Sequence, residues 1–457
     1  MEGSNGLARG PETDHRVVAG APERRASASR DELHDMRFPT LSAVLLLVCV
    51  AAFLGLRTAG GHASNTSHGF EAPVPMDLPG YLRPATDPAF GTSIVRISKP
   101  GPLGNGVVCG PKYCSHRYSS AQAWNADQTL LLLDNGCNGM CFLDGHTYAA
   151  LFWRKRAGEC EWHPRNAELM ICVHDRAVST WAPRTNHEAV LFTSPDYHDL
   201  QFGPSKGNPS RDGSRIAVRA VRKDGADVVF AYDLSQRQKF PDIELSHVPG
   251  KASSCTISPL GKYILCFQDL VDGTEQRAIF TVDGALHQRW TDHHRPGHGD
   301  LTVDADGSEV YVGISKSSPD KFQVIKRRLS DGKVTVLTAY GEAEHASTRA
   351  IARGDWVFLS YGGDPREVSA NPGWAPYARE VIALRIDGSG VIRRIVQTRN
   401  PPSDYWSETH ASPSPDGSQV IWSSNWGVPG GPVYEFVARL DWSERQNPKE
   451  VVANDQP

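Results

Sequence analysis

The residues of this chain best suited to chemistry are histidines at recurring positions. His298, His345 and His410 each stand a few residues before a turn motif, in three consecutive repeat units of the sequence. Imidazoles that converge from adjacent strands can bind a divalent ion, so these residues predict a metal site for manganese, calcium or zinc. The candidates for additional ligands are Glu344, Glu408 and Gln122. The alternative is that each histidine forms hydrogen bonds only within its own repeat unit.

A second group of polar residues belongs to the first three repeat units. His116 and Tyr118 supply an imidazole and a phenol close together, and we expect Tyr197 and Arg211 to reach the same end of the fold. The alternative for Arg211 is a solvated loop charge. His163 stands between a tryptophan and a proline, which indicates packing rather than ligation.

Several kinds of chemistry have no support in the sequence. It contains no Gly-rich phosphate loop, no Gly-x-Ser-x-Gly elbow and no His-Glu-x-x-His motif. Phosphoryl transfer, serine hydrolysis and zincin chemistry are therefore not expected. The formal net charge is only -4 and no basic stripe is present, so we expect no nucleic-acid partner.

A repeated strand pattern must position these residues. Seven units recur, each with a short strand, a turn of the Ser-Pro-Asp-Gly kind, a hydrophobic strand and a weaker pair of strands. This period, with 42 Gly and 32 Pro to supply turns, predicts an all-β, seven-bladed β-propeller. The second strands of the blades are expected at 130–133, 169–173, 216–218, 263–267, 310–312, 356–359 and 420–422. The extended segment 93–98 is expected to pair with the last blade and close the ring.

The cysteines provide an independent check of this pattern. Cys160 and Cys172 lie symmetrically about one predicted turn, and Cys255 and Cys266 lie almost symmetrically about another. Opposed positions of an antiparallel hairpin suit a disulfide, so we predict these two pairs. The other cysteines after the N-terminal region are Cys109, Cys114, Cys137 and Cys141. Their spacing fits either disulfides or a zinc site, and an exported location favours disulfides.

The N-terminal region predicts export. An Arg-rich polar segment precedes the apolar run 41–56, whose length lies between a signal-peptide core and a full membrane span. The basic flank places the N-terminus in the cytoplasm and everything after residue 57 outside it. We expect a single-pass anchor, or a secreted protein if the segment is cleaved. The expected organisation is a cytoplasmic tail at 1–36, the anchor or signal segment at 37–57, a linker at 58–84, the propeller at 85–445 and a C-terminal tail at 446–457.

Three segments of the sequence resemble a known group of enzymes. His116–Asp127, Gly207–Gly213 and His410–Gly417 are similar to segments of the seven-bladed propeller polysaccharide lyases, the oligogalacturonate lyases and ulvan lyases. The Ser-Pro-Asp-Gly part also resembles non-enzymatic propellers of the TolB type.

The resemblance implies roles for individual residues. The late-blade histidines of oligogalacturonate lyases hold a divalent metal, which carries over to His298, His345 and His410. The catalytic groups of ulvan lyases carry over to His116, Tyr197 and Arg211. The chain departs from the ulvan lyase pattern at Asn135-Gly-Cys-Asn138, where a second histidine would be expected.

The activity that this resemblance implies is β-elimination at a uronic acid. The proton beside a carboxylate becomes removable once a metal or cation neutralises the carboxylate and a base lies close to it. We therefore expect a polysaccharide lyase that acts on a polysaccharide or oligosaccharide, with membrane contact through the N-terminal segment. The alternative is a non-enzymatic propeller of the cell envelope that binds a glycan or a protein partner.

Overall fold

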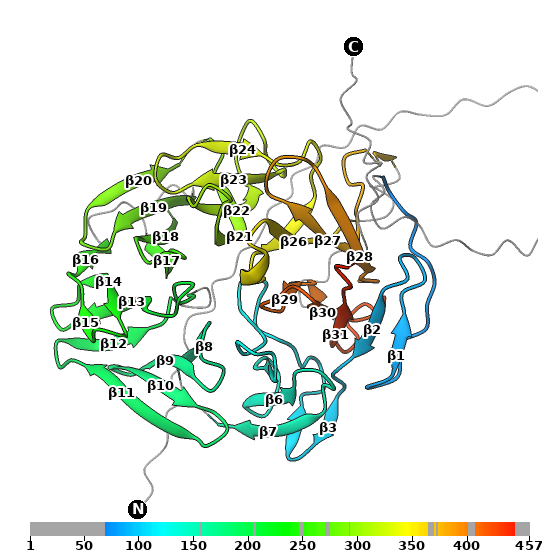
Figure 1. Ribbon diagram of the computed structural model, residues 1–457, viewed down its shortest axis with the longest axis horizontal. Helices are drawn as coiled ribbons and strands as arrows, with labels where there is room; N and C mark the ends of the chain where they lie inside the picture. The colour runs from blue at the N-terminus through cyan, green and yellow to red at the C-terminus, as the bar shows by residue number, and fades with distance from the viewer. Residues whose placement is uncertain are drawn as a thin grey trace, which may run out of the picture. The chain divides into compact units, whose positions relative to one another are not determined.

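The fold is a seven-bladed β-propeller. The computed structural model describes residues 69–155, 158–203, 207–245, 251–269, 275–291, 293–363, 370–371, 373–400 and 407–443. Their strands form seven blades around a central axis (Figure 1). Helix is nearly absent from these residues, which include the short 3-10 turn η2 (Ile351–Arg353). The fold class predicted from the repeats is confirmed.

Blades two to four follow the chain from the inside of the ring outward. Blade two consists of β8 (Glu159–Trp162), β9 (Met170–His174), β10 (Ala177–Ala182) and β11 (His187–Thr193). Blade three consists of β12 (Tyr197–Gln201), β13 (Arg215–Arg222), β14 (Asp227–Asp233), β15 (Gln238–Lys239) and β16 (Ile243–Glu244). Blade four consists of β17 (Lys251–Ile257), β18 (Tyr263–Asp269), β19 (Glu275–Thr281) and β20 (Leu286–Trp290).

Blades five and six repeat this order. Blade five consists of β21 (Pro296–Val303), β22 (Glu309–Ser315), β23 (Val324–Arg328) and β24 (Val334–Val336). Blade six consists of β25 (Ala343–Ser347), β26 (Trp356–Tyr361), β27 (Glu380–Arg385) and β28 (Ile392–Gln397). Every residue of β22 and β26 is buried, because neighbouring blades cover both faces of these second strands.

Blade one is less regular. Its strands are β5 (Leu130–Leu133), β6 (Met140–Asp144) and β7 (Ala150–Arg154). The inner position is taken by the segment 115–124, which pairs with β5 and the residues after it through two isolated bridges. The hairpin of β3 (Gly101–Gly104) and β4 (Val107–Cys109) packs against β7.

The N-terminal part of the propeller closes the ring. Blade seven contains β29 (Ser412–Pro413), β30 (Gln419–Ser424) and β31 (Tyr434–Arg439). Strand β2 (Ser93–Arg96) pairs antiparallel with β31, and β1 (Pro84–Thr86) lies outside β2. The segment expected at 93–98 therefore closes the ring, and no unpaired edge remains between the first and last parts of the chain.

The disulfides follow the predicted register. Cys160 faces Cys172 across β8 and β9, and Cys255 faces Cys266 across β17 and β18. Both pairs are bonded, with Cα atoms 4.1 Å apart. The remaining described cysteines form the disulfides Cys109–Cys114 and Cys137–Cys141. These four cysteines therefore form disulfides rather than the alternative zinc site, because a disulfide sulfur is not a thiolate ligand.

The predicted membrane segment at 37–57 lies outside the described residues, as do the tails at 1–36 and 446–457. Within the described part of the chain, we find no helix of the length and apolarity needed to cross a membrane.

Part of the expected linker at 58–84 contacts the propeller. The carbonyl oxygen of Gly69 accepts a hydrogen bond of 2.8 Å from the buried Arg394 side chain. The backbone N–H of Val74 donates to the Gln397 side chain at 2.8 Å, and the Trp426 indole donates to the Met76 carbonyl at 2.9 Å. We call this segment, residues 69–77, the strap.

A chain that begins at Tyr81 should be less stable than one that begins at Gly69. The shorter chain loses the carbonyl groups that accept from Arg394 and Trp426. A donor left without its acceptor costs about 1–3 kcal/mol, so the loss of two acceptors should lower the free energy of unfolding by roughly 2–6 kcal/mol. Denaturant unfolding of both chains measures the difference. Equal midpoints would mean that water replaces the strap contacts.

Candidate functional site: a histidine cluster and a central cavity

Two histidines and a glutamate meet where the innermost strands of blades six and seven begin. Glu408 Oε2 lies 3.2 Å from His410 Nε2 and 3.6 Å from His345 Nε2. One ligand atom from each residue lies within 4.8 Å of the other two. His345 is buried, whereas Glu408 and His410 are partly exposed. We call these three residues the histidine cluster.

Local backbone irregularities aim these side chains. The pairing of β25 with β26 shifts register between Ala343 and His345, and that of β21 with β22 shifts between Gly297 and Asp300. His410 adopts a left-handed backbone conformation with φ 45°. Bulges and left-handed residues re-aim side chains from a regular strand and are frequent beside functional sites.

His298 lies beside the cluster but outside the group of three. Its ring stacks on that of His345, with centroids 5.0 Å apart and planes 10° from parallel. The side chain is exposed, and its Nδ1 is bonded to the carbonyl oxygen of Glu344 at 3.0 Å. A carbonyl partner requires the proton on Nδ1, which leaves Nε2 as the basic atom of the neutral ring. Of the three predicted ligands, the structure thus brings His345 and His410 together and puts His298 at their side.

The donor set of the cluster fits a divalent cation. Metal bonds of about 2.1 Å place neighbouring ligand atoms about 3–4 Å apart, which matches the two measured separations. Two imidazole nitrogens and one carboxylate oxygen suit ions such as zinc, iron or manganese. Glu408, named from the sequence only as a candidate addition, is a full member of the cluster.

An aromatic ring covers the two histidines of the cluster. The Tyr118 ring lies 5.2 Å from that of His345 and 4.8 Å from that of His410, measured between centroids. Tyr118 therefore brings a phenol from blade one to the cluster. The sequence identified Tyr118 as a phenol near His116, but it could not predict that this phenol lies beside residues of two later blades.

A lysine that sequence reasoning missed also lies in this region. Lys316 directly follows β22. The last residue of β22, Ser315, pairs with Pro296 at the start of β21, so Lys316 lies near the start of that innermost strand. Burial lowers the pKa of Lys316, and Glu275 opposes this effect most strongly. Arg277 reinforces the lowering, whereas Glu344 and Glu408 oppose it more weakly than Glu275 does. A register count from the Ala305-Asp-Gly307 turn was the signal that could have located it.

Glu344 is a carboxylate beside the cluster that lies close to Gly362. Burial raises the pKa of Glu344 to about 7, and the neighbouring Glu408 and Glu342 carboxylates add to the rise. An added Cβ at position 362 would fall 1.7 Å from Glu344 Oε1, so a larger residue there would displace this carboxylate from its present position.

His116, expected to be catalytic, is a buried residue that contacts the backbone of His410. Its ring is buried, with Nδ1 2.9 Å from Glu435 Oε2 and Nε2 2.7 Å from the carbonyl oxygen of His410. Burial disfavours the charged ring, but the Glu435 carboxylate outweighs burial and the pKa of His116 is raised. Both ring nitrogens are thus engaged by protein groups, and the residue positions the His410 backbone.

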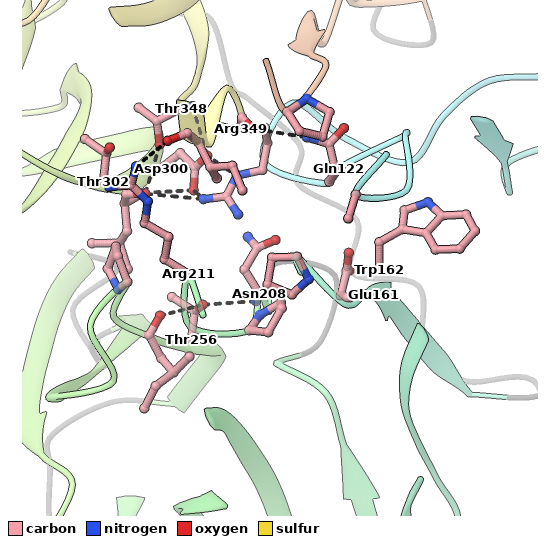
Figure 2. A pocket seen from close by; sticks show the side chains of 18 of the residues that line it. Gln122, Glu161, Trp162, Asn208, Arg211, Thr256, Asp300, Thr302, Thr348 and Arg349 are labelled. Atoms are coloured by element: carbon pink, nitrogen blue, oxygen red, sulfur yellow. Dashed lines mark hydrogen bonds and ion pairs between the residues drawn. The ribbon is translucent and has the colours of Figure 1, made fainter. Parts of the chain in front are cut away.

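The other residues expected to be catalytic lie elsewhere in the ring. The Tyr197 hydroxyl donates to Asp242 of blade three at 2.8 Å. Burial, the first cause, and Asp242 together raise the pKa of Tyr197 well above its ordinary value. Arg211 donates to the carbonyl oxygen of Ile351 at 2.5 Å and lines a cavity in the central channel (Figure 2). His163 accepts hydrogen bonds from the backbone of its own turn, as the packing interpretation predicts.

Solved structures share this architecture. An oligogalacturonate lyase in complex with manganese aligns with 82% of this chain and 99% of its own, at a TM-score of 0.54 and 16% identity. An oligogalacturonate lyase from Vibrio parahaemolyticus aligns with 79% of this chain and 97% of its own, at a TM-score of 0.52 and 12% identity. TolB from Acinetobacter baumannii aligns with 58% of this chain and 60% of its own, at a TM-score of 0.35 and 14% identity. No protein-family model and no curated protein sequence matches the chain. At these identities the likeness to the two lyases confirms the expected resemblance in fold.

Replacement of His116 by alanine should act on stability. The variant leaves the fully buried Glu435 carboxylate without the His116 ring as its partner, and breaking a buried pair costs about 3–5 kcal/mol. The Glu435→Gln variant should lose a similar amount, and the double variant much less than the sum. Chemical unfolding of the four proteins gives this cycle. Additive losses would contradict a direct His116–Glu435 interaction.

Proposed function

We propose that this propeller acts on uronate-containing glycans by β-elimination, at the histidine cluster. The observation that carries the proposal is the meeting of His345, Glu408 and His410 in a geometry that suits one divalent cation. The fold shared with oligogalacturonate lyases, one of them in complex with manganese, supports the choice of chemistry. Manganese, calcium and zinc are the candidate ions, and the two imidazole nitrogens favour manganese and zinc over calcium, which prefers oxygen ligands.

The ligand set accounts for carboxylate neutralisation. A divalent ion held by His345, His410 and Glu408 would supply the positive charge that makes the proton at C5 of a uronate acidic enough to remove. His298 extends the set on the exposed side, and Tyr118 limits it on the side of blade one. The chain's own part is to hold these donors at fixed separations before the substrate binds.

Lys316 is the base that we propose. Its lowered pKa increases the share of neutral amine near physiological pH, which a general base requires. The amine takes the C5 proton, the electron pair of the C–H bond forms the C4=C5 double bond, and the C4–O bond breaks. The departing glycosidic oxygen takes a proton from the Tyr118 phenol or from water. No oxidant, reductant or further reactant is needed.

The alternative function is binding without catalysis, at the cell envelope, of a glycan or a protein partner. The placement of the residues expected to be catalytic favours it, because His116 is buried against Glu435 and Tyr197 is bonded to Asp242. The two functions share the histidine cluster and differ in whether product forms.

We further propose that the propeller works outside the cytoplasm. All eight cysteines that follow residue 57 are bonded in four disulfides. Such bonds persist in oxidising compartments and are rare in the cytosol. This supports export by the N-terminal segment, either as a single-pass membrane protein or as a secreted one.

Purified protein should bind one divalent ion, and single substitutions in the cluster should release it. Elemental analysis of His345→Ala, His410→Ala and Glu408→Gln should give no stoichiometric metal, whereas Tyr118→Phe should retain it. The rate of formation of unsaturated product from a panel of uronate polysaccharides, followed by its ultraviolet absorbance, should fall by about 10²- to 10³-fold in the three cluster variants. Metal-free wild-type protein, after exposure to manganese, zinc and calcium, would rule out the site. Bound metal with no product from any polymer would favour the binding function.

The Lys316→Met variant should lose about 10²- to 10⁴-fold in rate, the usual contribution of a general base. In the wild type the rate should rise with pH as the amine of lowered pKa loses its proton, and the variant should lack this limb. The exposed Lys333, at the tip of the same blade, offers a matched control, since Lys333→Met should keep both the rate and the limb. An unchanged pH profile in Lys316→Met would exclude this lysine as the base.

A further inference from the structure

The central channel contains a second polar site. A cavity there is lined by residues of all seven blades, from Gln122 in blade one to Pro415 in blade seven (Figure 2). None of the residues of the histidine cluster lines it.

The cavity lies farther along the innermost strands than the cluster. Its lining segment 300–303 follows His298 within β21, and its segment 348–351 follows His345 after β25. In blade seven, Pro415 follows His410 by five positions. At about 3.3 Å per strand residue, these segments lie roughly 7–20 Å beyond His298, His345 and His410. The two sites are therefore separate along the channel.

Among the described residues, one cation of the cavity wall forms no ion pair. Arg349 is neutralised by Asp300, through two hydrogen bonds of 2.7 Å. Glu161 is paired with Arg117 at 2.5 Å. Arg211 differs from Arg349, because its hydrogen bond of 2.5 Å goes to a neutral carbonyl group. Within the described ranges, the Nε of Arg211 has no hydrogen-bond partner.

A neutral histidine supplies a second donor next to this arginine. His163 Nδ1 accepts from the backbone N–H groups of Arg165 and Asn166 at 3.1 and 3.0 Å. An Nδ1 that accepts two hydrogen bonds carries no proton, so the ring is neutral and its proton lies on Nε2. Burial lowers the pKa of His163, an effect that the nearby Asp212 carboxylate opposes. This Nε2 lies close to Gly213, where an added Cβ would approach it to 2.6 Å. Blade two thus presents an N–H group beside the turn that carries Arg211.

We propose that the cavity binds a small hydroxylated monocarboxylate, with its carboxylate on the Arg211 guanidinium and the His163 Nε2–H group. Guanidinium groups match carboxylates in geometry and in charge. Asn208, Thr256 and Thr302, which also line the cavity, offer neutral polar groups for the hydroxyl groups of such a ligand. This proposal does not depend on the lyase function, because the site shares no residue with the histidine cluster.

Calorimetric titration with galacturonate and with galactose tests the site. The full-length protein is first treated with a chelator, so that no divalent ion at the cluster can bind the probe. Galacturonate should bind about 10- to 100-fold more tightly than galactose, the factor expected for charge-assisted hydrogen bonds. Equal affinities for the acid and the neutral sugar would overturn the proposal.

Variants locate the binding. Arg211→Met should remove the preference for the acid, Arg211→Lys should retain part of it, and His163→Gln should weaken it. The control His410→Ala should bind galacturonate like the wild type. Thermal melts identify any variant that fails to fold, and Arg211→Gln then replaces Arg211→Met. Undiminished binding in folded Arg211 variants, or loss of binding in His410→Ala, would place the carboxylate elsewhere.

Discussion

The closure of the ring by β2 and β31 is the constraint on which the other features depend. Ser93 to Arg96 pair with Phe436 to Arg439, so strands far apart in sequence complete one blade. The same junction fixes blade one against blade seven, since His116 contacts Glu435 of β31 and the His410 carbonyl. An open ring would leave exposed strand edges. It would also separate Tyr118 from the two histidines that its ring covers.

The propeller combines regularly paired blades with irregular starts of the innermost strands. Disulfides bond the first strand to the second in blades two and four, and buried apolar side chains of the second strands fill the spaces between blades. The bulges at Gly297 and Ala343 and the left-handed conformation of His410 interrupt this regularity where the cluster forms. Regular strands provide stability, while the irregular starts choose the directions of the side chains.

The two sites of the channel differ in their electrostatics. Around the cluster, the neighbouring Glu408 carboxylate adds to the effect of burial in raising the pKa of Glu344. Such an excess of negative charge favours a cation. Along the cavity, the acidic groups Glu161 and Asp300 are paired with arginines, whereas Arg211 forms no ion pair with any described residue. One channel therefore offers a place for a cation and a place for an anion, at different depths.

The sequence by itself determined the features that depend on local register. The period of the turns gave seven blades, and the symmetric cysteines gave two disulfides, because facing positions of a hairpin follow from counting residues from its turn. It also identified His345 and His410 as candidate ligands, since each stands at the start of an innermost strand. The tertiary structure alone decided which of these side chains meet. The rotation of each ring depends on bulges, and contacts between blades depend on how the ring closes, neither of which a one-dimensional pattern records. For this reason only the structure showed that Glu408 belongs to the cluster and that Lys316 lies beside it. It also showed that His116, Tyr197 and Arg211 lie in three separate places.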